Sequence, residues 1–208
     1  MSQSKFHRLP SEKQVRIVNA AMKQFVQSGY EKASTNEIVK DAQISKGSLF
    51  NYFNNKKDLY LYLIVNALKF VDLILAEVDI SERDLFRRLS QIGFIKLKIQ
   101  QKYPLVFEFL KSTQLEEALE VKNEIASIIG SVLDSSLIRI YENIDLSKFR
   151  PDVNPEKALH ILNWTMRGFA EAQMEKVETF ENVGIELMDE WNGYMEILKR
   201  SFYKDGEE

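Results

Sequence analysis

Two short polar segments near the N-terminus carry the side chains best suited to specific hydrogen bonding. In the first, Ser34 stands three residues before Glu37, a spacing with which two side chains satisfy free amides at a helix start. In the second, Ser45 is a good N-cap for another helix. Hydroxyl, amide and ammonium groups along this second segment can bond to base edges or phosphates. The residues thus predict two short helices, near 35–42 and 46–53, that present polar groups to a partner.

The spacing of these two helices is that of a helix-turn-helix. Two short helices joined by about three to four residues, and supported by an earlier amphipathic helix near 11–28, form a compact trihelical domain. Such a domain can place its second helix in the major groove of DNA. Small residues at Gly47 and Ser48 allow close approach, while Leu49 and Phe53 are expected to face inward. Short paired helices also occur in unrelated proteins, so spacing alone leaves DNA binding open.

The charge of the chain is divided unevenly along the sequence. Residues 1–57 contain 10 Lys and Arg against 4 Asp and Glu, whereas residues 58–208 contain 18 against 27. A basic N-terminal module on an acidic body suggests a polyanionic partner, although chance segregation of surface charge gives the same counts. The lack of cysteine excludes disulfides, thiolate metal sites and a cysteine nucleophile, and it fits the cytoplasm.

The rest of the chain has the periodicity of helices, and strand signals are scarce. The apolar run 59–76 contains Asn66, Lys69 and Asp72 on one stripe, which favours an amphipathic helix in a soluble core over a membrane span. We therefore predict an all-α protein of about nine helices. A helix-turn-helix domain is expected over 1–55 and a larger helical domain over 56–208. The further helices are expected near 56–78, 82–101, 104–115, 117–143, 155–177 and 183–203.

Capping residues mark several of the predicted boundaries. A C′ glycine is typical of a helix end, and a proline at the first position is typical of a helix start. The boundary residues are Ser11 with Gln14, Gly29 as the end of the first helix, Asn55, Ser81 with Asp84, Pro104, and Asn154 before Pro155.

Three stretches of the N-terminal region resemble the signature of the TetR family of bacterial one-component repressors. They are 29–38 (GYEKASTNEI), 44–53 (ISKGSLFNYF) and 55–59 (NKKDL), and they lie within about the first 60 residues. The resemblance implies an N-terminal DNA-binding domain and a helical sensor domain that matches the family in layout. It also implies a set of DNA-binding residues: Thr35, Asn36, Lys46, Gly47, Ser48, Phe50, Asn51, Tyr52 and Lys56.

Within this set the resemblance assigns different roles. Thr35, Tyr52 and Lys56 would bind phosphates, and Asn36 would reach a base edge. Two positions depart from the family pattern: Gln43 stands where glycine is common, and Phe50 stands where tyrosine is usual. Phe50 can offer only apolar contact, such as to a thymine methyl, and Gln43 is strained if its backbone is left-handed.

The resemblance further places a small-molecule effector in a pocket among the middle helices. Aromatic and Met side chains at helical spacing also form ordinary cores, so a core role stays open for most candidates. Arg167 suits either an anionic ligand group or a surface salt bridge. The candidate pocket residues are Phe94, Phe107, Phe109, Leu110, Trp164, Arg167 and Met174.

The apolar stripes of the last two helices suit a bundle, and the family pairs these helices across a homodimer; an intramolecular core is the alternative. A two-fold dimer predicts a pseudo-palindromic operator in double-stranded DNA. The expected function is a transcriptional regulator, typically a repressor released by its effector. The alternative function is that of a helical adaptor that does not bind DNA, or of an enzyme that carries a trihelical module. With only His7 and His160 and no nucleophile motif, we expect no enzyme, metal site or cofactor.

Overall fold

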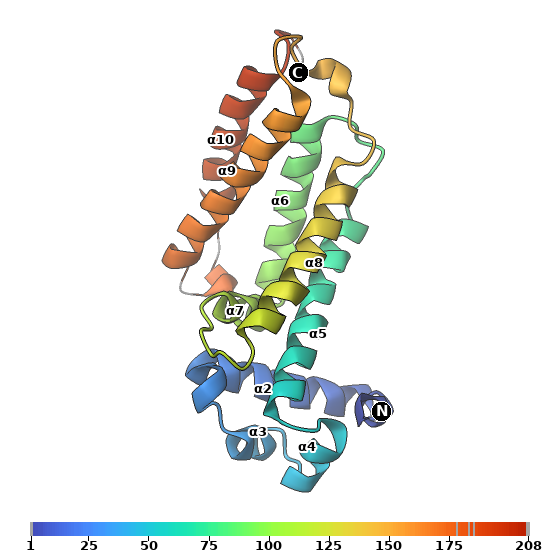
Figure 1. Ribbon diagram of the computed structural model, residues 1–208, viewed down its shortest axis with the longest axis vertical. Coiled ribbons are helices and arrows are strands. Elements are labelled where there is room, and N and C mark those ends of the chain that lie inside the picture. The colour runs from blue at the N-terminus through green and yellow to red at the C-terminus, as the bar shows by residue number, and fades with distance from the viewer. Residues whose placement is uncertain (1, 178, 183, 185, 207–208) are drawn as a thin grey trace. The chain divides into compact units, whose positions relative to one another are not determined.

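In the computed structural model, residues 2–177, 179–182, 184 and 186–206 are described, and they form helices without any strand (Figure 1). The predicted all-α class is confirmed. A short N-terminal helix adds to those expected from the sequence. The α-helices are α1 (Ser2–Phe6), α2 (Ser11–Lys32), α3 (Thr35–Asp41), α4 (Lys46–Tyr52), α5 (Lys56–Ala76), α6 (Leu85–Lys102), α7 (Pro104–Gln114), α8 (Lys122–Tyr141), α9 (Pro155–Lys176) and α10 (Glu186–Phe202), with 3-10 turns η1 (Leu146–Lys148) and η2 (Phe180–Asn182).

Backbone contacts divide the chain into two compact units. The first comprises Met1–Val71 with Tyr103–Asp134, and the second comprises Asp72–Lys102 with Ser135–Glu208. The first unit therefore contains the whole predicted helix-turn-helix domain together with α7 and the first part of α8. The predicted boundary between residues 55 and 56 does not coincide with this division, and it stays a prediction about functional domains.

The core of the first unit is built on the apolar face of α2. Ile17 and Phe25 of this helix are buried in one cluster with Ile38 of α3 and Leu49 of α4. Figure 1 shows α3 and α4 together beside α2. These contacts fix the two short helices, which are too short to be stable alone.

An aromatic cluster joins α2 to α5 and α7 within the same unit. The Tyr60 ring lies 4.7 Å from the Phe25 ring and 5.5 Å from the Phe109 ring, measured between centroids, and both pairs are edge-to-face. Glu116, just after α7, accepts a hydrogen bond of 2.8 Å from the Tyr30 amide. The end of α2 is thereby tied to the segment that follows α7.

Most predicted caps are confirmed by hydrogen bonds. Ser34 accepts from the Glu37 amide at 3.4 Å, and Ser45 accepts from the Ser48 amide at 3.1 Å. Further along, the Asn55 and Asn154 side chains accept from the third amide of α5 and α9, and Pro104 and Pro155 open α7 and α9.

Three predicted capping assignments were wrong, although α2 does begin at Ser11 as predicted. Pro10, not Ser11, is the N-cap of α2, and Gln14 turns its amide to the Leu9 carbonyl at 2.8 Å. Gly29 adopts the left-handed backbone expected of it, with φ of 68°, but it kinks the chain and one further helical turn follows. Asp84 caps α6 in place of Ser81, because its carboxylate accepts from the Arg87 amide at 3.0 Å.

Helix α5 alone among the described residues is long and apolar enough to cross a membrane, with a mean hydropathy of 1.8. Its inner side nevertheless packs in the first unit, where Leu63, Ile64 and Ala67 are buried. Lys69 and Asp72, which belong to the predicted polar stripe, are exposed. This pattern is that of an amphipathic core helix, as predicted.

Two buried charged groups join segments of the second unit. The Arg88 guanidinium, 1% exposed, donates to the carbonyls of Ile80, Glu82, Ile140 and Glu142, which joins the start of α6 to the end of α8. Because a buried guanidinium needs partners for its donors, this set of carbonyls fixes the geometry of the two helix ends.

Asp84 forms the other buried charged contact, and Lys148 of η1 donates to it at 2.8 Å. Burial opposes ionisation of Asp84, but the hydrogen bonds from Lys148 and the Arg87 amide outweigh it and lower the Asp84 pKa. Elsewhere in this unit α10 packs closely on α6, since a Cβ built at Gly93 would lie 2.8 Å from the Met188 methyl.

Candidate nucleic-acid interface

The turn between α3 and α4 sets the angle at which α4 is presented. Ala42 is buried, and the next residue, Gln43, has the left-handed φ of 53° that was expected if it replaces a glycine. The Ile44 amide then donates to the Val39 carbonyl at 3.0 Å, and Ser45 caps α4. Arg16 of α2 braces this turn by donating to the Ala42 carbonyl at 2.8 Å.

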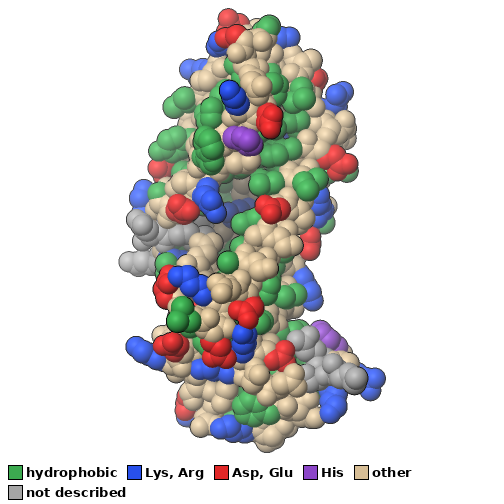
Figure 2. All heavy atoms as spheres, viewed as in Figure 1, with side chains coloured by type: hydrophobic (Ala, Val, Ile, Leu, Met, Phe, Trp, Pro, Cys, Tyr) green, Lys and Arg blue, Asp and Glu red, His purple; other side chains and the backbone are tan. Residues whose placement is uncertain are grey.

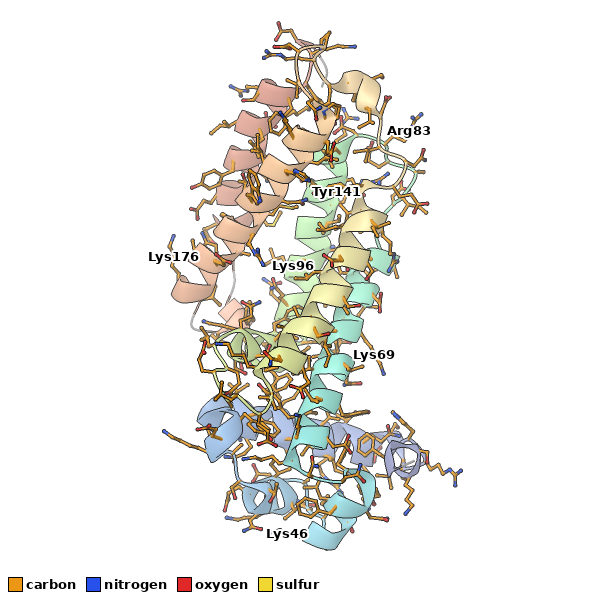
Figure 3. All side chains as sticks on the ribbon, in the orientation of Figure 1. Lys46, Lys69, Arg83, Lys96, Tyr141 and Lys176 are labelled. Carbon is orange, nitrogen blue, oxygen red and sulfur yellow. The ribbon has the colours of Figure 1, made fainter. Side chains whose placement is uncertain are left out.

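One face of α4 packs on the domain and the other is free. Leu49, predicted to face inward, is 1% exposed, and Phe53 just after the helix is equally buried. Lys46, Gly47 and Asn51 are exposed, and Figure 3 shows the Lys46 side chain at the outer edge of α4. The outer face is therefore an exposed strip of small, amide and cationic groups, with the Phe50 ring beside them.

Gly47 leaves the outer face of α4 open near the start of the helix. A Cβ built on Gly47 meets no protein atom within 4 Å. The fold therefore has room for a larger side chain at this position, and glycine in a helix is less stable than alanine. Gly130, Gly168 and Gly193 are open in the same way, so openness by itself does not mark a binding site. At Gly47 it leaves room for the close approach of a ligand or nucleic acid.

The other predicted contacts surround this strip in the first unit. Thr35 and Asn36 form the first turn of α3, where Asn36 is exposed and Thr35 is half-buried. Ser48 is half-buried, and its hydroxyl lies 2.8 Å from the Ser45 hydroxyl. Phe50 is 37% exposed on the outer face, so its ring is available for apolar contact.

Two predicted phosphate ligands have partners inside the protein. Tyr52 is 8% exposed, and its ring packs against Phe6 with centroids 6.0 Å apart. The Lys56 ammonium donates to the Glu31 carbonyl at 2.9 Å and lies 4.8 Å from the centre of the Tyr30 ring. Lys56 thus stabilises the C-terminal end of α2, which sequence reasoning did not indicate, and its phosphate contact stays a prediction.

Helix α1 was missed altogether by sequence reasoning. Its Lys5 donates from Nζ to Oδ1 of Asn51 at 2.8 Å, so a residue of the N-terminal segment contacts the outer face of α4. The only signal for this placement was an aromatic residue, Phe6, within a polar and basic segment, because a five-residue helix shows no periodicity.

Comparison with known proteins agrees with this geometry. Residues 17–63, from the middle of α2 into α5, match the model of bacterial regulatory proteins of the tetR family. The chain is 23% identical over 170 residues to the negative transcriptional regulator IcaR of the biofilm operon icaADBC from Staphylococcus epidermidis, covering 80% of this chain and 90% of that protein. This chain is a TetR-family transcriptional regulator. The regulator is a DNA-binding protein with a helix-turn-helix, and the adaptor and enzyme reading is not favoured.

Solved structures share the fold of the regulator over almost its whole length. A TetR-family regulator from Chloroflexus aurantiacus has a TM-score of 0.64 at 21% identity, covering 97% of this chain and 98% of that one. The regulator FadR from Bacillus subtilis, solved in complex with stearoyl-CoA, has a TM-score of 0.60 at 20% identity, covering 88% and 96%. At sequence identities of 20–21%, this similarity shows a shared fold and nothing more.

The residues predicted for the effector pocket are divided between the two units. In the first, Phe107 and Phe109 are buried core residues, with Phe109 fully covered, and Leu110 packs partly buried against the same core. For these three residues, burial is consistent with ordinary core packing, which was the alternative to a role in the pocket.

The remaining pocket candidates belong to the second unit. Phe94 is 45% exposed in a shallow groove between α6 and α10, and Trp164 is 69% exposed on α9. Arg167 is exposed and lies 3.6 Å from Glu171, which is the surface ion pair that was weighed against ligand recognition. The side chain of Met174 lies outside the described residues. A pocket shared by these candidates stays a prediction.

Lys96 on α6 is a candidate that the sequence analysis did not single out. Figure 2 shows a hollow over α6 in the second unit, and in Figure 3 the Lys96 side chain extends from α6 into the space beside α9. Solvent reaches the side chain, yet the surrounding protein desolvates the ammonium and lowers the Lys96 pKa. Among the described residues nothing pairs with this ammonium by a hydrogen bond or an ion pair.

Proposed function

We propose that this regulator represses transcription by binding a pseudo-palindromic operator as a homodimer, with the outer face of α4 in the major groove. The observation that carries the proposal is this outer face, with Gly47 open, Lys46 and Asn51 exposed, and an excess of basic residues in the surrounding module. Helix N-termini and lysines attract phosphates, while amides read base edges. We also propose that the protein acts in the cytoplasm, where bacterial DNA lies.

The second copy is expected to pair through α9 and α10. The stripe of Met188, Trp191 and Met195 is buried within the chain, so it forms the intramolecular core that was the alternative for this helix. Another set of large apolar side chains on the same two helices remains exposed and is available for a symmetric four-helix contact: Ile161, Trp164, Tyr194 and Ile197.

The effector is expected to carry an anionic group that pairs with Lys96. An ammonium in a partly desolvated hollow gains a strong partner when a carboxylate or phosphate binds beside it. Tyr141 of α8 donates to the Asn163 side chain of α9 in the same unit, which adds polar groups for orienting a ligand. The stearoyl-CoA complex of FadR makes acyl-CoA a suitable first probe.

The DNA-binding part is tested by selecting fragments from random and genomic DNA with the purified protein. A footprint on the best fragment should be pseudo-palindromic, and affinity should fall steeply with salt because bound lysines release counterions. Asn51→Ala and Tyr52→Phe should each weaken binding. If no fragment is enriched over non-specific DNA even at low salt, the proposed function is wrong.

The effector part is tested by adding stearoyl-CoA or stearate to the operator complex. Release of DNA should be lost in Lys96→Met. Lys98→Met is the matched control, because Lys98 is an exposed neighbour on α6 that lies 4.3 Å over the Phe94 ring. If a probe releases the wild-type protein from the operator and also releases Lys96→Met and Lys98→Met equally well, the proposed role of Lys96 is wrong.

A further inference from the structure

Lys5 of α1 changes what Asn51 can offer to a base. Its Nζ lies 2.8 Å from Asn51 Oδ1, and both side chains are exposed on the first unit. An ammonium has three donors and no acceptor, so the amide oxygen of Asn51, not the amide nitrogen, must face it. The Asn51 NH₂ group is then the part left to meet a partner.

The position of Lys5 is fixed by the residue beside it. Phe6 is fully buried, and its ring centroid lies 5.1 Å from that of Phe53 and 5.3 Å from that of Tyr62. These contacts hold α1 against the end of α4 and the start of α5. The backbone at Lys5 is therefore held in place. A hydrogen bond from Lys5 to Asn51 then costs less conformational entropy than the same bond from a lysine in a flexible N-terminal tail.

The pair has a base preference that Asn51 alone does not have. A free asparagine binds adenine in a bidentate manner, with Oδ1 accepting from N6 and Nδ2 donating to N7. With one lone pair of Oδ1 bonded to Lys5 and the ammonium charge beside it, Oδ1 is a poorer acceptor for the adenine N6 amino group, and donors dominate what the pair presents. Guanine has only acceptors, N7 and O6, on its major-groove edge. We propose that Lys5 and Asn51 together read guanine in the operator, and that Lys5 sets this preference.

This inference rests on the proposed placement of α4 in the major groove, and it adds Lys5 as a specificity-determining residue. Lys5 is otherwise expected to act as one of several basic residues of the N-terminal segment, which bind phosphates without sequence preference. The two roles differ in a measurable way. Loss of a phosphate contact weakens binding to all sequences equally, whereas loss of a base-reading contact changes preference at one position.

The test is selection from operator half-sites randomised at each position, with four proteins compared. The wild type should require guanine at one position of each half-site, and Asn51→Ala should lose preference at that same position. Lys5→Met frees Oδ1 of Asn51, so the preference for guanine over adenine there should fall about tenfold or reverse, in line with the discrimination of a bidentate contact. Arg8→Ala is the matched control, because Arg8 is an exposed basic residue of the same segment.

The base preferences of the variants distinguish base reading by Lys5 from simple phosphate binding. Arg8→Ala should lower affinity at most uniformly and leave the guanine position intact. If Lys5→Met behaves like Arg8→Ala, Lys5 binds phosphate only and the inference is wrong while the proposed function stands. If Asn51→Ala changes preference at no position, the placement of α4 fails, and the inference fails with it. Thermal unfolding of the variants shows whether each is folded.

Discussion

Replacement of Gly47 by alanine should separate the stability of this regulator from its function. Because a Cβ at this position meets nothing within 4 Å, the added methyl causes no clash in the free protein. Alanine in a helix is more stable than glycine by roughly 0.5–1 kcal/mol. For a chain of this size that gain corresponds to a rise in Tm of about 1–4 °C. Urea or thermal unfolding measured by circular dichroism gives the value.

The same methyl should weaken operator binding. If α4 lies in the major groove with Gly47 against DNA, the methyl must be accommodated by displacement, which costs about 1–3 kcal/mol by analogy with overpacked cores. That corresponds to roughly 5- to 150-fold in Kd, measured by fluorescence anisotropy on the selected operator. Gly130→Ala is the control, because Gly130 of α8 is also open and should raise Tm without changing Kd. Operator binding by Gly47→Ala with wild-type affinity would refute the placement of α4.

Three further predictions concern the frame around the interface. Gln43→Gly should stabilise the protein by up to about 1 kcal/mol, since glycine relieves the left-handed backbone at φ of 53°, and a lower denaturation midpoint in urea would contradict this. Asp84→Asn should cost about 1–3 kcal/mol at pH 7. Because the Asp84 pKa is lowered in the folded state, that stabilisation is present above about pH 4 and is lost as the pH falls through the folded-state pKa, so the difference between the two proteins in unfolding experiments should shrink as the pH is lowered below 4. Glu116→Ala removes the acceptor for the Tyr30 amide and should cost about 2 kcal/mol of unfolding free energy. In a titration of the operator complex with effector, it should also weaken release from DNA, and unchanged release would separate this contact from signalling.

Local signals of the chain were sufficient to predict α3, α4 and the turn between them. The caps Ser34 and Ser45 act within one helical turn, so their spacing alone predicted the starts of α3 and α4 correctly. The inward direction of Leu49 follows from helical periodicity, and the possibility of a left-handed backbone at Gln43 came from the family resemblance, in which glycine is common there. Such features depend on neighbours within a few residues, which is why they can be read from the sequence.

Features that depend on distant segments were not accessible in this way. The stripe of Met188, Trp191 and Met195 has the same spacing whether it faces its own chain or a second copy, and only packing against the rest of the second unit shows that it is buried. Likewise, the candidate pocket residues Phe107 and Phe109 are buried in the structure, and this could not be predicted because burial depends on which helices surround them.

The sequence by itself therefore determined the helix-turn-helix, the family resemblance and which face of α4 is exposed. Tertiary structure alone decided that Lys5 meets Asn51, because a residue 46 positions away is brought to α4 by the burial of Phe6. It also decided that the Lys96 side chain extends from α6 into the space beside α9 without a described partner, since desolvation of an ammonium depends on the protein around it (Figure 3). Hydrogen bonds between remote side chains carry no periodic signal, so the partner of each such group emerges only when the chain is folded.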